Sequence, residues 1–202
     1  MLIRDADGDE DPDRWRRFLR DQGFGHFVAA GAGRPVPVVV PTQYVVTDTE
    51  IVFHLIATNP VFDALAENSR AIMSVAGDWA FIPGAWKAIG DEDPARGIPT
   101  TYYAAVQVTG ECTVQTDPDE VAALLAMQLG ALDPGGEYVD PSEHAARLRQ
   151  IRGIRLDIQA VRAKYKYGGN VDQEHRDAVA ARLTSRDGPG DRAALEHLRL
   201  TH

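Results

Sequence analysis

Hydrophobic residues occur along this chain mostly in short strand-like runs, with fewer helix-like patterns between them. The runs are rich in valine, isoleucine and aromatic residues, and Gly, Pro or Thr-Asp-Thr separates them, which predicts an antiparallel meander early in the chain. Later runs alternate apolar with polar residues, as a half-exposed strand does. The predicted strands cover residues 25–30, 36–40, 44–47, 51–56, 71–75, 79–82, 102–108, 111–114 and 154–158.

Helix signals stand between these runs. Asp11-Pro12 and Asn59-Pro60 each pair an N-cap residue with a proline. Because the strand-like runs follow one another without regular crossover helices, the pattern favours an α+β fold with an antiparallel β-barrel core over βαβ winding. Three further helices are predicted: one from Asp117 to a C-cap at Gly130, one capped by Ser142 that carries Leu148 and Ile151, and a last one that carries Val179 and Leu183.

Length, charge and cysteine content exclude several classes of protein. The chain has 202 residues with 44% hydrophobic content, enough for one good core, and we interpret it as one domain. The formal net charge of −9 disfavours direct contact with DNA, which requires a basic face. The single Cys112 excludes an intramolecular disulfide and is expected to fill the core. We find neither a signal peptide nor an apolar run of about 18 residues, so a cytoplasmic protein without a membrane span is expected.

Common catalytic motifs are absent. The sequence has no Walker loop, nucleophile elbow, H-E-x-x-H motif or paired cysteines, and no residue stands out as a general acid or base. The six histidines form no convincing i, i+4 pair, which disfavours a structural zinc site. His54 lies within the apolar run 51–56. A histidine in such a run is more often a hydrogen-bonded residue of a core or barrel lumen than a ligand.

Residues 162–170 form the most informative segment. They contain two of the chain's three lysines and two tyrosines, where a strand is predicted to end. Lysine charge and flat aromatic faces suit an anionic, aromatic ligand, and Gly168-Gly169 would let backbone amides approach it closely. The alternative to a ligand-binding role is purely structural: the strand ends, a helix begins with an N-cap at Asn170, and the lysines are solvated.

Four segments together resemble a known family. Residues 53–60, 80–86, 98–106 and 162–170 occur in the order and spacing of the PaiB-like proteins, usually described as FMN-binding negative transcriptional regulators. That family is related to the pyridoxamine-phosphate-oxidase-like and flavin-reductase-like split barrels, and the resemblance spans about residues 24–183. It implies an antiparallel split β-barrel with peripheral helices, a single flavin-binding domain over residues 1–202 with a helical C-terminal extension from about 171 to 202, and a homodimer with flavin sites at the interface.

The resemblance also implies cofactor-binding residues. Amides at the helix start after Asn59 can hold a phosphate, Lys166 can add charge there or near N1 of the ring, and aromatic side chains can form walls for the ring. The chain departs from the family pattern at Thr101-Tyr102, where Trp-Asn is common, and at Gly168-Gly169, where Ser-Gln is common. The residues that match the family pattern are Asn59, Thr100, Tyr103, Lys166 and Asn170. Thr58 beside the phosphate, and Trp86 and Tyr102 as further walls for the ring, complete the set of expected cofactor-binding residues.

Two classes of function follow from the resemblance. One is a flavin-dependent oxidoreductase of small molecules, and the other is a flavin-linked transcriptional regulator without turnover. FMN is the implied cofactor, with deazaflavin and haem as alternatives, because relatives of this fold bind each of them. A haem-dependent branch that forms nitrogen–nitrogen bonds resembles PaiB proteins, and His54, Tyr102 and Tyr103 would then be the axial-ligand candidates.

Overall fold

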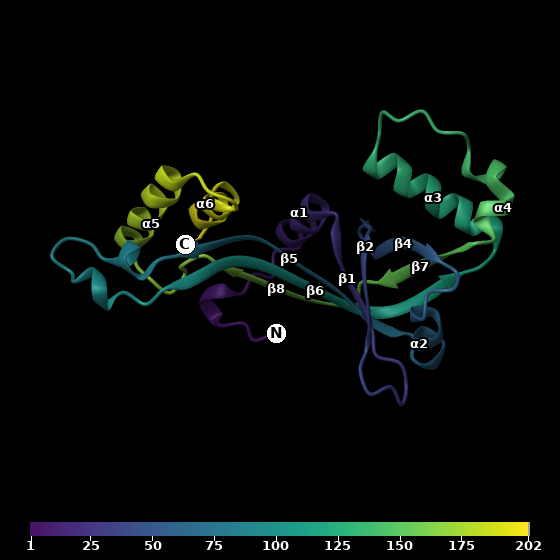
Figure 1. The fold of residues 1–202 in the computed structure, drawn as a ribbon, viewed down its shortest axis with the longest axis horizontal. Coiled ribbons are helices and arrows are strands. Elements are labelled where there is room, and N and C mark those ends of the chain that lie inside the picture. The colour runs from purple at the N-terminus through teal and green to yellow at the C-terminus, as the bar shows by residue number, and fades with distance from the viewer. Residues whose placement is uncertain (202) are drawn as a thin grey trace. The chain divides into compact units, whose positions relative to one another are not determined.

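Antiparallel strands with short helices between them make up most of the fold (Figure 1). The structure is a computed structural model, and it describes residues 1–201. The strands are β1 (Phe24–Ala29), β2 (Val38–Gln43), β3 (Val45–Val46), β4 (Glu50–Ile56), β5 (Arg70–Ile82), β6 (Thr100–Gln115), β7 (Ile151–Asp157) and β8 (Ala160–Lys166). The α-helices are α1 (Pro12–Gln22), α2 (Val61–Glu67), α3 (Pro118–Leu132), α4 (Ala145–Leu148), α5 (Gln173–Arg186) and α6 (Asp191–Arg199), and the 3₁₀ helices are η1 (Asp5–Asp7), η2 (Gly84–Lys87), η3 (Pro94–Arg96) and η4 (Pro141–His144).

The strands pair in the order β2-β1-β5-β6-β7-β4-β3, and β8 pairs with β6. Neighbours such as β1 and β2, or β4 and β7, run antiparallel throughout their registers. The predicted antiparallel α+β class is therefore confirmed. None of the helices within residues 1–201 is long and apolar enough to cross a membrane.

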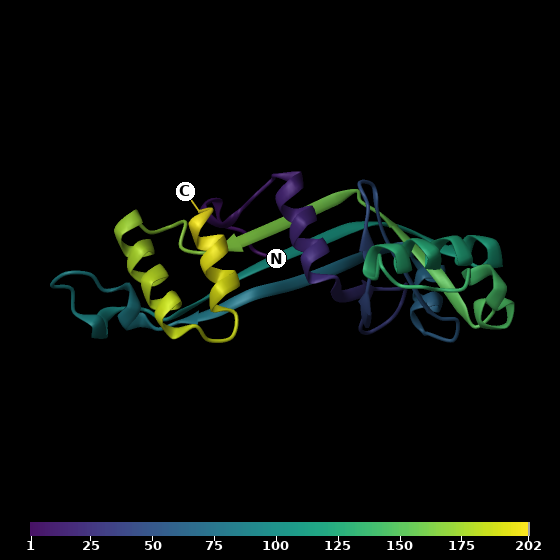
Figure 2. The ribbon, with the colours of Figure 1, turned by 90° about the horizontal axis from the view of Figure 1, so that it is seen from above.

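The chain divides into two compact units, which share strands β5 and β6. Unit 1 comprises residues 1–11, 76–106 and 162–202, and unit 2 comprises residues 12–75 and 107–161. The division into two units argues against one domain, whereas the two long strands that both units share argue for it. The interpretation as one domain therefore stays a prediction. The helical region expected from about residue 171 contains α5 and α6, which lie side by side in Figure 2.

Unit 2 is built around a curled sheet. The rings of Phe27 in β1 and Phe53 in β4 meet edge to face, with centroids 4.9 Å apart, and both side chains are fully buried. In the hydrogen-bonded order, β5, β6 and β7 lie between these two strands, so a flat sheet would keep the rings apart. Their contact shows that this sheet bends around an interior, as in a partly closed barrel.

In unit 1, α6 packs against the segment that ends β8 through aromatic side chains. The imidazole of His197 stacks on Tyr167 at 4.7 Å, and its Nε2 lies 2.8 Å from Oδ2 of Asp78. The hydroxyl of Tyr167 donates to the carbonyl oxygen of Asp78 at 2.7 Å. Asp78 has φ 51°, which interrupts the extended backbone of β5. These contacts hold the C-terminal helix at a kinked strand.

Four predicted strands were too short, because they merge in pairs into two long strands. Residues 71–75 and 79–82 belong to one strand, β5, and residues 102–108 and 111–114 belong to another, β6. Gly110 suggested a break, but the backbone continues through it. The glycine is needed because a Cβ there would collide with the carbonyl oxygen of Asp157. Cys112 in β6 is only half-buried, and burial raises the pKa of its thiol to about 12.

Several helix boundaries also differ from the prediction. Helix α3 continues through Gly130 to Leu132, and Asp133 is its C-cap. Asp140 rather than Ser142 accepts the capping hydrogen bond before η4, and Ile151 already begins β7. Asn170 is not an N-cap, because α5 begins later. The N-cap of α5 is Asp172, which accepts a hydrogen bond from the amide of His175 at 3.0 Å.

Candidate functional site

The ends of β6 and β8 bring together side chains from two distant segments of unit 1. Lys166, the last residue of β8, donates from Nζ to Oγ1 of Thr100, the first residue of β6, at 2.8 Å. The ring of Tyr103 lies 5.9 Å from Nζ of Lys166 and 5.5 Å from Nζ of Lys164. Three residues implied by the family resemblance, Thr100, Tyr103 and Lys166, therefore form one cluster.

Positive charge in this cluster is incompletely compensated. Lys164 lies 3.6 Å from Asp7 and donates to the carbonyl oxygen of Leu2 at 3.1 Å, so its charge is paired. Within residues 1–201, Lys87 and Lys166 form no ion pair with a carboxylate. Burial lowers the pKa of Lys87, and the positive charge of Lys166 lowers it further. Two neighbouring ammonium groups without a counter-charge form an attractive place for an anion.

The glycine pair has an internal structural role. Gly168 is buried with φ 82°, and a Cβ on it would lie 2.6 Å from the hydroxyl of Tyr102. A Cβ on Gly169 would collide with the carbonyl oxygen of Ala6. Tyr102 itself is only 3% exposed, burial raises the pKa of its phenol, and its ring packs edge to face against Tyr167. The turn after β8 is therefore tight because protein atoms surround it.

Trp86 and Asn170 also belong to unit 1. Trp86 is half-buried in η2, where the guanidinium of Arg186 covers its ring at 4.5 Å, and its carbonyl oxygen accepts from Arg182. Asn170 has an exposed side chain in the turn that precedes α5. The structure therefore leaves the side chain of Asn170 accessible, whereas one face of the Trp86 ring is covered.

Thr58 and Asn59 belong to unit 2, not to the unit that contains Lys166. Asn59 accepts from the amide of Val61 through Oδ1 at 3.0 Å. The amide of Val61, which was expected to face a phosphate, thus already donates to the side chain of Asn59. The helix that follows, α2, has only seven residues.

His54 also lies in unit 2, and it is hydrogen-bonded as expected. Its Nδ1 is 2.6 Å from Oε1 of Gln128, a side chain that is 5% exposed. The imidazole lines a pocket of about 570 Å³ that is largely apolar and includes Leu125, Leu148 and Ile151. Within residues 1–201, no group of three or more His, Cys, Asp or Glu side chains is placed to hold a metal ion.

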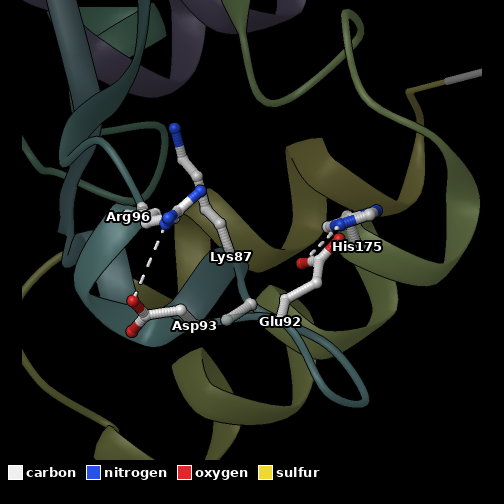
Figure 3. A pocket seen from close by; sticks show the side chains of 7 residues that line it. Lys87, Glu92, Asp93, Arg96 and His175 are labelled. Carbon is white, nitrogen blue, oxygen red and sulfur yellow. Dashed lines mark hydrogen bonds and ion pairs between the residues drawn. The ribbon is translucent and has the colours of Figure 1, made fainter.

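A second pocket, of about 590 Å³, lies in unit 1 and was not predicted from the sequence (Figure 3). His175 joins its two walls, because Nδ1 lies 2.8 Å from Asp172 and Nε2 lies 3.3 Å from Glu92. Those carboxylates raise the pKa of His175, with Asp172 making the larger contribution. Nothing local in the acidic segment 91–93 indicates a partner in α5. The lining residues are Lys87, Ala88, Glu92, Asp93, Arg96, Gly97 and His175.

The curled antiparallel sheet, the peripheral helices and the cationic aromatic cluster define a split-barrel protein of the flavin-binding class. The chain belongs to the family described as "Putative FMN-binding domain", whose model matches residues 1–160. This membership confirms FMN as the cofactor expected for the family.

Comparison with individual proteins agrees with this assignment. "Protease synthase and sporulation protein PAI 2" of Bacillus subtilis (strain 168) is 21% identical over 187 residues, which cover 89% of this chain and 87% of that protein, and it confirms the PaiB resemblance. The flavocytochrome Anf3 from Azotobacter vinelandii is similar in structure, with a TM-score of 0.63 and 18% identity over 84% of this chain and 74% of that one. The FAD and heme binding protein from Mycobacterium smegmatis has a TM-score of 0.63 and 18% identity, over 87% of this chain and 80% of that one. At these identities the two structures show the shared split-barrel fold.

Proposed function

We propose that the chain binds FMN through the cluster at the ends of β6 and β8. The observation that carries the proposal is the Lys166 ammonium group, which Thr100 holds at 2.8 Å and no carboxylate within residues 1–201 neutralises. A phosphate or a reduced, anionic flavin ring would supply that missing charge. Tyr103 offers a flat face beside the same ammonium group.

Each residue of the cluster has a defined part in this proposal. Lys166 supplies the charge, Thr100 orients its side chain, and Tyr103 offers a wall for the ring. Tyr102, which is buried, packs beside Gly168 and supports the turn that leads to the exposed Asn170. FMN supplies hydride or electron transfer when it is bound, so the protein needs no general acid or base of its own for that step.

The activity that fits this site is a flavin-dependent oxidation or reduction of a small molecule. A flavin-linked regulator without turnover is the alternative, and the net charge of −9 disfavours a version that contacts DNA directly. The experiment is an FMN titration followed by visible absorption, and then NAD(P)H oxidation by the loaded protein. Saturable binding supports the cofactor site, whereas binding without turnover by any common electron donor would favour the regulator.

We also propose that the protein forms a homodimer through the outer face of β5 in unit 1. Trp79 and Phe81 alternate with the buried Ala80 on this strand and are 61% and 50% exposed. Neighbouring exposed aromatic residues on one strand face are typical of an interaction surface. A second copy of the chain is the occupant that the family resemblance implies.

Haem is a second candidate cofactor, and the surroundings of His54 favour it. An amide oxygen accepts hydrogen bonds, so the contact with Gln128 places the proton on Nδ1 and leaves the lone pair on Nε2. That imidazole lines a largely apolar pocket, which fits a haem-binding environment. Haemin titration of the protein and of His54→Ala would test this, with His26→Ala as the control at an exposed histidine. A Soret shift that survives His54→Ala would exclude His54 as the ligand.

A further inference from the structure

We infer that the pocket lined by Lys87 and Arg96 is the substrate site, and that the substrate is a small anion bearing a phosphate or carboxylate group. This inference rests on the proposed flavin site, because it assigns the molecule with which the flavin would exchange electrons. The pocket volume of about 590 Å³ matches those that hold small ligands, which are roughly 300–1,000 Å³.

The acidic side chains of the pocket are already engaged within the protein. The carboxylate of Glu92 accepts from the amide of Ile89 at 3.1 Å and lies 3.3 Å from Nε2 of His175. Asp93 accepts from the amide of Ala95 at 2.9 Å and thereby caps η3. Glu92 is thus paired with His175, and Asp93 is held at the start of η3.

The basic side chains are much less engaged. Lys87 forms no ion pair within residues 1–201. The guanidinium of Arg96 lies 3.8 Å from Asp93, but these side chains are 89% and 58% exposed, so the pair is weak. Figure 3 shows Lys87 and Arg96 on one side of the pocket and the His175–Glu92 pair on the other. Asp93 lies on the same side as Arg96, so two positive charges stand there against one carboxylate, and the net charge offered to a ligand is positive.

The loop that carries these cations is held in place. Gly84 and Gly97 pack backbone to backbone, so closely that a Cβ on either would collide with the other. His175 fastens Glu92 to the start of α5. A fixed loop loses little entropy when a ligand binds, which favours a specific anion site.

The pocket is also electrostatically linked to the flavin cluster. Lys87 lines the pocket, and its pKa is lowered by the charge of Lys166 as well as by burial. An anion beside Lys87 would relieve that repulsion. Gly97, which lines the pocket, also stands only three residues before Thr100 of the flavin cluster. The arrangement thus favours anionic substrates over neutral or cationic ones.

The experiment measures pyrophosphate binding to the FMN-loaded protein by calorimetry, with the amide NMR signals of Ala88 and Gly97 as a local reporter. Loading with FMN first keeps the probe away from Lys166. We expect Lys87→Gln and Arg96→Gln each to weaken pyrophosphate binding roughly tenfold, as loss of a charge-assisted contact does. Arg192→Gln is the matched control, because Arg192 is exposed on α6.

The outcomes separate this inference from the proposed function. If FMN binds normally to Arg96→Gln while pyrophosphate binding falls, both proposals are supported. If FMN binds but pyrophosphate does not, or if pyrophosphate binds both pocket variants as tightly as it binds the unmodified protein, the substrate site is refuted and the flavin site stands. If FMN fails to bind to the unmodified protein, the proposed function fails and the substrate assignment falls with it.

Discussion

Lys166 donates a 2.8 Å hydrogen bond to the hydroxyl of Thr100, and this contact joins the last residue of β8 to the first residue of β6. The two residues are 66 positions apart in the sequence. A lysine side chain has many rotamers, so this bond fixes the ammonium group in one place before a ligand arrives. Pre-organised charge of this kind favours an anionic cofactor.

Lys166→Ala should weaken FMN binding by about 1–3 kcal/mol, the usual cost of losing a charge-assisted hydrogen bond. The measurement is the dissociation constant from an absorbance titration. Arg162→Ala is the control, because Arg162 is an exposed cation on the same strand. If both variants titrate like the unmodified protein, Lys166 is only a solvated lysine.

Thr100→Val should weaken FMN binding by about 0.5–1.5 kcal/mol, because valine keeps the side-chain shape but cannot accept from Lys166. Thr100 acts through the lysine, so the double variant Thr100→Val with Lys166→Ala should bind about as weakly as Lys166→Ala alone. Full additivity in this double-mutant cycle would show that the two side chains contribute independently.

Gly110→Ala should destabilise the fold by about 1–3 kcal/mol or more, because the new Cβ would collide with the carbonyl oxygen of Asp157. Gly130→Ala should instead stabilise it by about 0.5–1 kcal/mol, since Gly130 lies inside α3 with open space around it. Urea unfolding of both variants measures the two free energies. Equal effects of the same sign would contradict the packing at Gly110.

These two glycines also show where sequence patterns succeed and fail. Glycine signals a turn or a helix end on local statistics, and both predictions were wrong because the reasons for each residue are not local. Gly110 is required by a carbonyl from another segment, and Gly130 lies in a helix that already has good caps and packing. The strand runs themselves were found, since alternation of apolar residues is set by burial on one face.

Prediction of the candidate site was uneven for the same reason. Family resemblance pointed to Thr100, Tyr103 and Lys166, and the structure brings them together. The pocket beside Lys87 could not be found, because it depends on the contact between His175 and Glu92, which are 83 residues apart. The helical extension expected from about residue 171 was not divided into α5 and α6, and the packing of His197 in α6 on Tyr167 was not predicted. Only tertiary contacts reveal such features.

Trp79→Ser combined with Phe81→Ser should convert the proposed dimer into a monomer of about 22.1 kDa. Both side chains are at least half exposed, so their loss should remove interface area with little effect on the fold. Light scattering coupled to gel filtration measures the mass. Phe24→Ser, at an exposed aromatic residue of unit 2, is the control. A monomeric parent protein would refute the interface.

The contact that closes the loop of residues 87–97 onto α5 should depend on pH. Hydrogen bonding to Asp172, and then to Glu92, raises the pKa of His175. The stability that protonated His175 gives to the loop contact is therefore complete below the unfolded-state pKa of about 6.5. That stability is lost as pH rises through the higher folded-state pKa. Hydrogen bonds with backbone amides and with His175 lower the pKa of Asp172 and Glu92. The stability that these two carboxylates give to the loop contact is therefore lost as pH falls below about 4.

Amide hydrogen exchange at Ala88 and Gly97 should thus be slowest, after correction for intrinsic rates, between about pH 5 and 6.5. His175→Gln keeps a polar side chain but cannot become charged, so it should abolish the loss of protection between pH 6 and 8. If the variant and the parent lose protection equally over that range, the His175 contact does not hold the loop, and another interaction must fix the wall of the anion pocket.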